Sequence, residues 1–310
     1  MSARLSREFL LAYIEDKELP ARSGEPLAAA AEKIIRYGAF VGSVIERHGS
    51  LNRTMLYARE RIEHCERAAV PVANGTVILA DTLSESKGRF TREWHAPRGG
   101  LWGSLIYVST LLPRYRMLVP LAVGVACCEA VREFGARDAM IRWINDVLID
   151  GYKVGGFLAE SFTGHFSGEE YCLLGFGINV NNGVFPEELA ATATSLTEHL
   201  GRRVAVDEFA CCFLAKLWWN LGLLYYQEEV ELQVDAGKSY AGTHPLISRW
   251  LELSDTLGRE IIFGVDVVTS PQYRATAAGI TSNGGLRLIL EDGSDIVEYS
   301  GEIRYLDEYA

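Results

Sequence analysis

The sequence predicts an α+β protein in which helices pack on one face of a mixed β-sheet, followed by a small C-terminal β-barrel. Three observations support this. The chain has 310 residues, of which 48% are hydrophobic, and this is enough for a large core. From Phe40 onward, strand-like and helix-like segments alternate without regular βαβ repeats. The last part of the chain has short β-type segments separated by turn-forming residues.

Residues 1–39 are predicted to form an N-terminal helical extension. Apolar residues recur at helical spacing over residues 5–13 and 27–35, and the segment from Pro20 to Pro26 separates the two runs. The extension is short for a complete winged-helix DNA-binding domain. We therefore expect a helical cap or an oligomer contact, and no operator binding.

Residues 40–242 are predicted to form the main domain. Runs rich in β-branched and apolar residues predict its strands, and apolar stripes at helical spacing predict its helices. The expected strands cover residues 40–46, 76–81, 101–112, 140–143, 147–149, 153–161 and 171–180, and the expected helices cover 52–66, 119–134 and 207–226.

Residues 243–310 are predicted to form a separate small β domain. Short β segments are expected at 260–268, 273–280, 286–291 and 295–299. Asn283-Gly284-Gly285 and Asp292-Gly293 lie between them, and such pairs are typical of hairpin turns.

Composition argues against several classes of function. The formal net charge is -11, whereas affinity for nucleic-acid phosphates depends on clustered Lys and Arg, so no nucleic-acid partner is expected. No apolar run has the length of a membrane span, and the first residues lack the pattern of a signal peptide. We expect a cytoplasmic protein without a membrane partner. The six cysteines lack zinc-site spacing and are interpreted as buried small hydrophobic residues.

The segment from Ser84 to Gly100 combines cations, glycines and an aromatic residue. Lys87, Arg89, Arg92 and Arg98 can hold phosphate oxygens, glycines allow the backbone to approach a ligand, and a Trp offers a flat apolar wall. By itself the pattern is equally typical of a solvated surface loop.

The segment from Arg142 to Glu160 is predicted to form a β-hairpin with its turn near Asp150-Gly151. This places Lys153 across the hairpin from the Asn145-Asp146 pair. A lysine there supplies positive charge where negative charge develops. Alone, the segment is more typical of an exposed hairpin with a salt bridge.

The third segment is Gly175-Phe176-Gly177-Ile178-Asn179, in which two glycines leave room for a ligand beside a strand. The amide of Asn179 could face a purine edge. Taken alone, a structural bulge explains the pattern better.

Together and in this order, the three segments resemble the biotin protein ligase family. The family motifs are a basic glycine loop ending in a Trp and a Gly-Gly-Leu, then Asn-Asp with a Lys seven residues later, then Gly-x-Gly-Ile-Asn. The C-terminal part is similar to the family's SH3-like domain. The resemblance covers about residues 40–305 and rests on the following matches: Gly88, Arg89, Arg92, Trp94, Pro97, Gly99, Gly100, Leu101, Trp143, Asn145, Asp146, Lys153, Gly156, Glu160, Gly175, Gly177, Ile178, Asn179, Leu257-Gly258-Arg259, Gly279-Ile280, Gly285-Leu286, Gly293 and Ser300-Gly301-Glu302.

The resemblance implies a biotin/lipoate ligase-like fold and a two-step reaction with ATP and Mg²⁺. Biotin would become biotinyl-5'-AMP, and a lysine of a biotin carrier domain would then accept the biotinyl group. The resemblance also implies that Lys153, Arg89 and Asp146 are catalytic, and that Asp146 orients the acceptor amine. It places Arg92 at the phosphates, Trp94 at the acyl pocket and Asn179 near the adenine. The implied binding residues further include Lys87, Gly88, Gly99, Gly100, Asn145 and Gly156. A homodimer through the main sheet is consistent with the resemblance.

The departures from the family pattern gather where the acyl head group is expected. Ser50-Leu51-Asn52 stands at the Ser-Thr-Asn motif, whose hydroxyls help to bind the biotin ring, and Leu83 stands at a Gln that contacts the ureido group. The first Gly-Arg of the basic loop is Ser86-Lys87, and the Lys and Pro beside Trp143 are Arg142 and Ile144. Leaving ureido polar groups unpaired costs roughly 1–3 kcal/mol each.

Three hypotheses follow. The first is a biotin protein ligase that activates biotin. The second is a ligase of the same fold that activates another small-molecule acid, such as a lipoyl-like or fatty acid, and Leu51 with Leu83 favours it. The third is a non-catalytic binding or regulatory relative, against which Lys153 and Arg89 argue.

Overall fold

The computed structural model describes residues 4–24, 26–89, 92–233 and 244–306. Residues 90–91, within the basic segment Ser84 to Gly100, and the expected boundary at 242–243 lie outside them. The main sheet has seven strands in the order β1-β2-β3-β7-β6-β5-β4. Only β1 and β2 run parallel, so the sheet is mixed, as the sequence predicted. The strands are β1 (Ile45–His48), β2 (Val77–Ala80), β3 (Leu101–Val108), β4 (Met140–Arg142), β5 (Asp146–Ile149), β6 (Tyr152–Thr163) and β7 (Glu170–Ile178).

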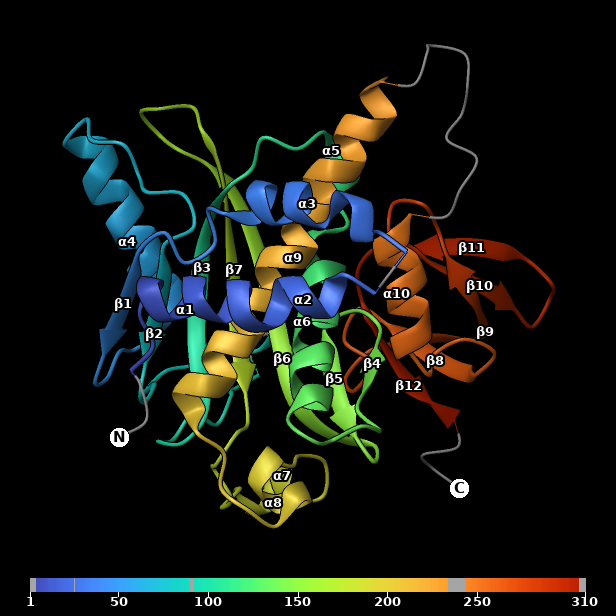
Figure 1. Cartoon of the computed structure of the whole chain (residues 1–310). Coiled ribbons are helices and arrows are strands. Elements are labelled where there is room, and N and C mark those ends of the chain that lie inside the picture. Colours follow the sequence, from blue (N-terminus) through green and yellow to red (C-terminus); the bar gives the residue numbers. More distant parts are fainter. Residues whose placement is uncertain (1–3, 25, 90–91, 234–243, 307–310) are drawn as a thin grey trace.

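Helices cover both faces of this sheet (Figure 1), whereas the sequence predicted helices on one face, because apolar side chains lie on both sides of the strands. Helix α4 (Thr54–Arg67) packs on one face, where Ile78, Ile106 and Leu173 form a small apolar cluster with it. Helices α6 (Val119–Glu133) and α9 (Val206–Gln233) cover the other face and form the main core. Because side chains of a strand alternate between faces, Ile106 and its neighbour Leu105 contribute to opposite cores.

The N-terminal extension forms a second helical layer on α9 (Figure 1). It contains α1 (Arg7–Tyr13), a π-helical turn (Ile14–Glu18), α2 (Leu19–Arg22), a 3₁₀ turn (Ala28–Ala30) and α3 (Ala31–Gly38). Helix therefore continues through Pro20, which was expected to separate two helices. Pro20 is the second residue of α2, which directly follows the π-helical turn, so the regular α-helical hydrogen bonding is already interrupted where its N–H is missing. The two helical segments themselves were predicted.

A buried cluster of charges holds the extension in place. Glu18, at 1% exposure, pairs with Arg22 at 2.8 Å and with Lys216 of α9 at 2.7 Å. Arg22 also pairs with Glu129 of α6 at 2.7 Å. Burial by itself raises the pKa of Glu129, but the guanidinium groups of Arg22 and Arg249 outweigh it and lower that pKa to about 2. The carboxylate thus stays charged inside the protein.

In the C-terminal part, a helix that was not predicted precedes the strands. Helix α10 (Pro245–Leu253) packs on α6, and His244 caps it by accepting a hydrogen bond from the Leu246 N–H at 3.1 Å. A nine-residue helix beside a β-rich segment gives a weak periodic signal, so only β segments were expected there.

Five antiparallel strands follow α10 in the order β11-β10-β9-β8-β12. Among the described residues the two edge strands do not pair with each other, so they form an open sheet rather than the expected closed barrel. The last strand was not anticipated. The strands are β8 (Glu260–Gly264), β9 (Pro271–Ile280), β10 (Leu286–Leu290), β11 (Asp295–Glu298) and β12 (Glu302–Tyr305).

One boundary in the main domain also differs from the expectation. The first strand was expected at 40–46, but residues 40–44 form turns and β1 begins at Ile45. Gly42 adopts a φ of 68° and its N–H donates to the Gly75 carbonyl at 2.9 Å, which turns the chain before the strand. Short helices α5 (Pro113–Arg116), α7 (Glu187–Ala190) and α8 (Leu196–Leu200) lie in the connections. Among the described residues, no helix combines the length and the apolar character that a bilayer crossing requires.

The buried charge cluster yields a stability prediction. Glu18→Gln removes a carboxylate that faces Arg22 and Lys216, and breaking a buried ion pair typically costs 3–5 kcal/mol. We expect a loss of about 3 kcal/mol in urea unfolding, at the lower end because other carboxylates still face both cations. Glu15→Gln, on the exposed side of the same helical segment, is the control and should change stability by less than about 0.5 kcal/mol. Equal stability of the two variants would contradict the prediction.

Candidate active site

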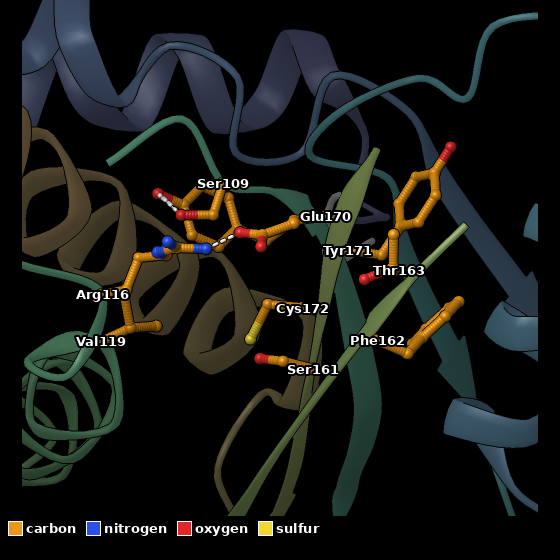
Figure 2. A pocket seen from close by; sticks show the side chains of 10 residues that line it. Ser109, Arg116, Val119, Ser161, Phe162, Thr163, Glu170, Tyr171 and Cys172 are labelled. Carbon is orange, nitrogen blue, oxygen red and sulfur yellow. Dashed lines mark hydrogen bonds and ion pairs between the residues drawn. The ribbon is translucent and has the colours of Figure 1, made fainter. Parts of the chain in front are cut away.

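The main cavity of the protein lies on the α4 side of the sheet and has a volume of about 1010 Å³. Its walls come from β5, β6, β7, the basic loop, the start of α4, residues 185–193 and the C-terminal sheet. A second cavity of about 190 Å³ lies at the other end of β6 and β7 (Figure 2). There Arg116 points to Glu170 and pairs with it, and none of the predicted site residues is present. The larger cavity is therefore the candidate site.

The hairpin of β5 and β6 brings a lysine and a carboxylate together in this cavity. Its turn lies at Asp150-Gly151, where φ is 51° and 82°, which suits a tight two-residue hairpin turn. Lys153 Nζ lies 2.7 Å from Asp146 Oδ1. This confirms the predicted arrangement across the hairpin.

The backbone of Lys153 is held from its other side by the chain after α7. Its N–H donates to the Thr192 carbonyl at 2.8 Å, and its carbonyl accepts from the Thr194 N–H at 3.0 Å. Both Lys153 and Asp146 remain partly exposed, at 33% and 26%. The ammonium group is therefore fixed in position while a ligand can still reach it.

Glycines make the floor of the cavity beside Lys153. Gly156 of β6 pairs with Gly177 of β7. A Cβ on Gly177 would lie 2.7 Å from Trp94 Nε1, and one on Gly156 would lie 3.0 Å from Lys153 Cε. Larger residues would displace both side chains. The glycines thus let the Trp94 ring lie close to the sheet, with Lys153 Nζ 5.3 Å from its centroid.

In the basic loop (residues 84–100), backbone hydrogen bonds join the residues before position 90 to those after position 91. The Trp94 N–H donates to the Ser86 carbonyl at 3.1 Å, and the Gly88 N–H donates to the Arg92 carbonyl at 2.7 Å. Lys87 pairs with Glu93 through a β-bridge. Lys87, Gly88, Arg89, Arg92 and Trp94 all line the cavity.

Two arginines of this loop contact the C-terminal domain. Arg89 Nη1 donates to the Gly301 carbonyl at 2.6 Å, and burial lowers the pKa of Arg89. Arg92 pairs with Asp266 at 3.0 Å and with Glu302. Glu302 and Val267 also line the cavity, so the C-terminal domain forms part of the site. Glu302 belongs to the C-terminal motif Ser300-Gly301-Glu302, but no role in the site was predicted for it.

Two asparagines of the predicted site also line the cavity. The Asn145 side-chain N–H donates to the Phe157 carbonyl at 2.8 Å, which joins the two arms of the hairpin next to the Asp146–Gly156 pair. Asn179 is buried, and its side-chain oxygen accepts from Asn182 Nδ2 at 2.8 Å. This leaves the amide N–H groups of Asn179 as the donors that a ligand could use.

Five predicted residues do not line the cavity. Leu51 pairs with Leu83 through a β-bridge and packs against the apolar cluster under α4, so only Leu83 lines the cavity. Asn52 accepts a hydrogen bond from the Ser84 hydroxyl at 3.2 Å. The other residues outside the lining are Ser50, Gly99 and Gly100.

The backbone geometry explains why glycine stands at positions 99 and 100. Gly99 has a φ of 115°, and a Cβ on Gly100 would lie 2.0 Å from the Trp102 ring. The structure therefore explains these glycines by chain geometry. Arg53, by contrast, lines the cavity but was not anticipated, because a single Arg before a helix carries no distinctive sequence signal.

The contacts of Arg92 yield a prediction about the basic loop. Glu302→Gln removes one charge of a partly exposed ion pair, which is worth about 0.2–1 kcal/mol. Amide hydrogen exchange of residues 86–94 should therefore accelerate about twofold to fivefold. Asp295→Asn, which breaks the ion pair with Arg287 elsewhere in the same sheet, is the control and should leave this loop unchanged. Identical loop exchange in both variants would show that Glu302 does not hold the loop.

Comparisons with known proteins agree with this geometry. The sequence profile of the biotin/lipoate A/B protein ligase family matches residues 66–177. The chain is 30% identical over 193 residues to the bifunctional ligase/repressor BirA of Bacillus subtilis, which covers 59% of this chain and 57% of that protein. It is 27% identical over 236 residues to the biotin--[acetyl-CoA-carboxylase] ligase of Paracoccus denitrificans, covering 71% and 86% respectively. The chain thus spans little more than half the length of the Bacillus relative.

The fold also matches a solved structure. Biotin protein ligase from Aquifex aeolicus, in complex with biotin and ATP, superposes with a TM-score of 0.65 and 24% identity, over 85% of this chain and 99% of that one. This likeness shows that the fold is shared. The profile of the biotin/lipoate A/B protein ligase family thus matches residues 66–177, and the similarity to ligases in sequence and fold extends beyond that segment.

Proposed function

We propose that this protein is an ATP-dependent ligase that activates biotin as biotinyl-5'-AMP and transfers the biotinyl group to a lysine of a carrier protein. The observation that carries the proposal is the pairing of Lys153 with Asp146 over a glycine floor in the main cavity. The curated relatives in Bacillus subtilis and Paracoccus denitrificans are ligases, and the name of the second specifies biotin.

In the first proposed step, a carboxylate oxygen of biotin attacks the α-phosphorus of ATP. A new P–O bond forms, the bond from the α-phosphorus to the bridging oxygen breaks, and pyrophosphate leaves. The Lys153 ammonium group stabilises the negative charge that gathers on the α-phosphate. Arg89 and Lys87, which line the same cavity, supply further positive charge for the phosphates.

In the second step, the ε-amine of the acceptor lysine attacks the acyl carbon of the adenylate. The neutral amine forms a C–N bond, the bond from carbon to the phosphate oxygen breaks, AMP leaves with the bonding electrons, and the proton lost by the nitrogen passes to solvent water. Asp146 is placed to orient that amine, since its carboxylate already holds the ammonium group of Lys153. This requires Asp146 to exchange one ammonium partner for another as the acceptor enters.

Magnesium fits this site as an ion carried on the phosphates of ATP. Among the described residues, no group of three or more His, Cys, Asp or Glu side chains is placed to hold a metal ion. Mg²⁺ in nucleotide sites commonly binds substrate phosphates, waters and one or two carboxylates. Asp146, which lies beside Lys153, is a carboxylate that would contribute to holding the ion.

The proposal divides the chain into a helical extension (1–39), a catalytic domain (40–242) and an SH3-like domain (243–310). Helix α10 packs on α6, so the last two parts share an apolar contact as well as the cavity.

One observation favours a second candidate, a ligase of the same fold for an acid with an apolar end. Leu83 lines the cavity where the family's Gln binds the ureido group of biotin. A leucine gives no hydrogen bond to that group, whereas it suits a lipoyl-like or fatty acid.

The proposal predicts that Lys153→Met abolishes most of the exchange of labelled pyrophosphate into ATP in the presence of biotin. Removing one group that stabilises transition-state charge typically lowers kcat by about 10²–10³-fold. Lys17→Met, on the exposed face of the N-terminal extension, is the control and should exchange at the wild-type rate. Wild-type protein that exchanges pyrophosphate with none of biotin, lipoate and octanoate would refute the proposed activity.

A further inference from the structure

The cavity continues along β6 away from Lys153. Gly156, Leu158 and Glu160 alternate on one strand, so they lie on the same face of the sheet, and all three line the cavity. At about 3.3 Å a residue, this floor extends about 13 Å from Gly156 to Glu160. An acid whose carboxylate lies at Lys153 would therefore lay its chain along this floor.

The start of α4 covers the middle of that floor. Gly175 pairs with Leu158, and a Cβ on Gly175 would lie 2.4 Å from Met55 Sδ. One turn further along α4, Arg59 pairs with Glu160 at 3.4 Å and lies over the Phe162 ring, 4.1 Å from its centroid. The first two turns of α4 thus face the part of the cavity that is remote from Lys153.

Arg53 immediately precedes α4, two residues before Met55, and it lines the cavity. Its Nε atom is buried and has no hydrogen-bond partner. Within the described ranges Arg53 makes neither an ion pair nor an aromatic contact. The other arginines that line the cavity all have partners within the protein: Arg59, Arg89, Arg92, Arg142 and Arg304.

A buried guanidinium N–H without a partner is unfavourable, and an arginine side chain donates hydrogen bonds but accepts none. The group that satisfies Arg53 must therefore be a hydrogen-bond acceptor. Met55, Leu83 and Leu158, which line the same cavity, offer no strong acceptor, and the Glu160 carboxylate is already paired with Arg59. A ligand in the cavity is therefore the source of the acceptor that we consider.

We propose that Arg53 determines acyl specificity by donating hydrogen bonds to an acceptor at the far end of the acid. The inference rests on the proposed function and selects among its substrates. The ureido carbonyl of biotin is such an acceptor, whereas the methyl end of a fatty acid and the dithiolane of lipoate are not strong acceptors. Arg53 thus takes over the head-group contact that Leu83 does not make.

The test compares Arg53→Met with wild type by calorimetric titration of biotin without ATP, and by pyrophosphate exchange with biotin and with octanoate. Removing hydrogen bonds from a charged donor should weaken biotin binding about 10- to 100-fold. The KM for biotin should rise by the same factor, while kcat at saturating biotin changes less than about threefold. The KM for octanoate should stay the same or fall.

Two further variants separate a specificity role from a structural one. Arg61→Met is the matched control. Arg61 lies in α4, the helix that Arg53 precedes, where it pairs with Glu46 at 2.9 Å and does not line the cavity. This variant should bind biotin as wild type does. Arg53→Lys keeps the charge with a single donor group and should bind biotin between Arg53→Met and wild type. Thermal unfolding of each variant checks that the fold is retained.

Two results would overturn the inference and leave the proposed function standing. One is equal biotin affinity of wild type and folded Arg53→Met, and the other is wild-type exchange that is as efficient with octanoate as with biotin. Exchange with none of the acids would instead overturn the proposed function, and the inference with it. A rise in KM for biotin alone would support both.

Discussion

The site depends on one constraint of the main sheet, which is that β6 and β7 pair glycine against glycine at Gly156 and Gly177. With no side chains there, the Trp94 ring can lie close to the sheet and Lys153 can lie beside it. The tight turn at Asp150-Gly151 then sets the register that brings Lys153 to Asp146. The position of the ammonium group is therefore a property of the sheet backbone more than of the surrounding side chains.

Residues of both the main domain and the C-terminal domain line the cavity. Arg89 and Arg92 reach the last strand region through Gly301 and Glu302, so the C-terminal domain helps to set the position of the basic loop. These arginines would also be needed by the phosphates of a nucleotide. In the proposed function, nucleotide binding and the contact between the domains would use the same two arginines, so a change in one would alter the other.

The sequence predicted the α+β class, the placement of most strands and the hairpin that carries Lys153, because these follow from local periodicity and turn chemistry. It did not predict α10, whose nine residues give little periodic signal, nor the open form of the C-terminal sheet, which is decided by long-range pairing. It also put Leu51 in the acyl pocket. Strand pairing instead turns Leu51 into the apolar cluster under α4 and leaves Leu83 in the wall. Arg53 was missed because only the packed structure shows that its guanidinium lacks a partner.

Glu129 forms ion pairs with two arginines, Arg22 of the N-terminal extension and Arg249 of α10. One carboxylate in α6 therefore joins segments that are more than two hundred residues apart in the chain. A shortened protein without residues 4–24 would leave Lys216 without Glu18 and Glu129 without Arg22, and would uncover the apolar residues of α9 on which the extension packs. The extension is thus not a detachable module: a minimal catalytic unit that begins at residue 40 would have to be redesigned in α6 and α9 as well.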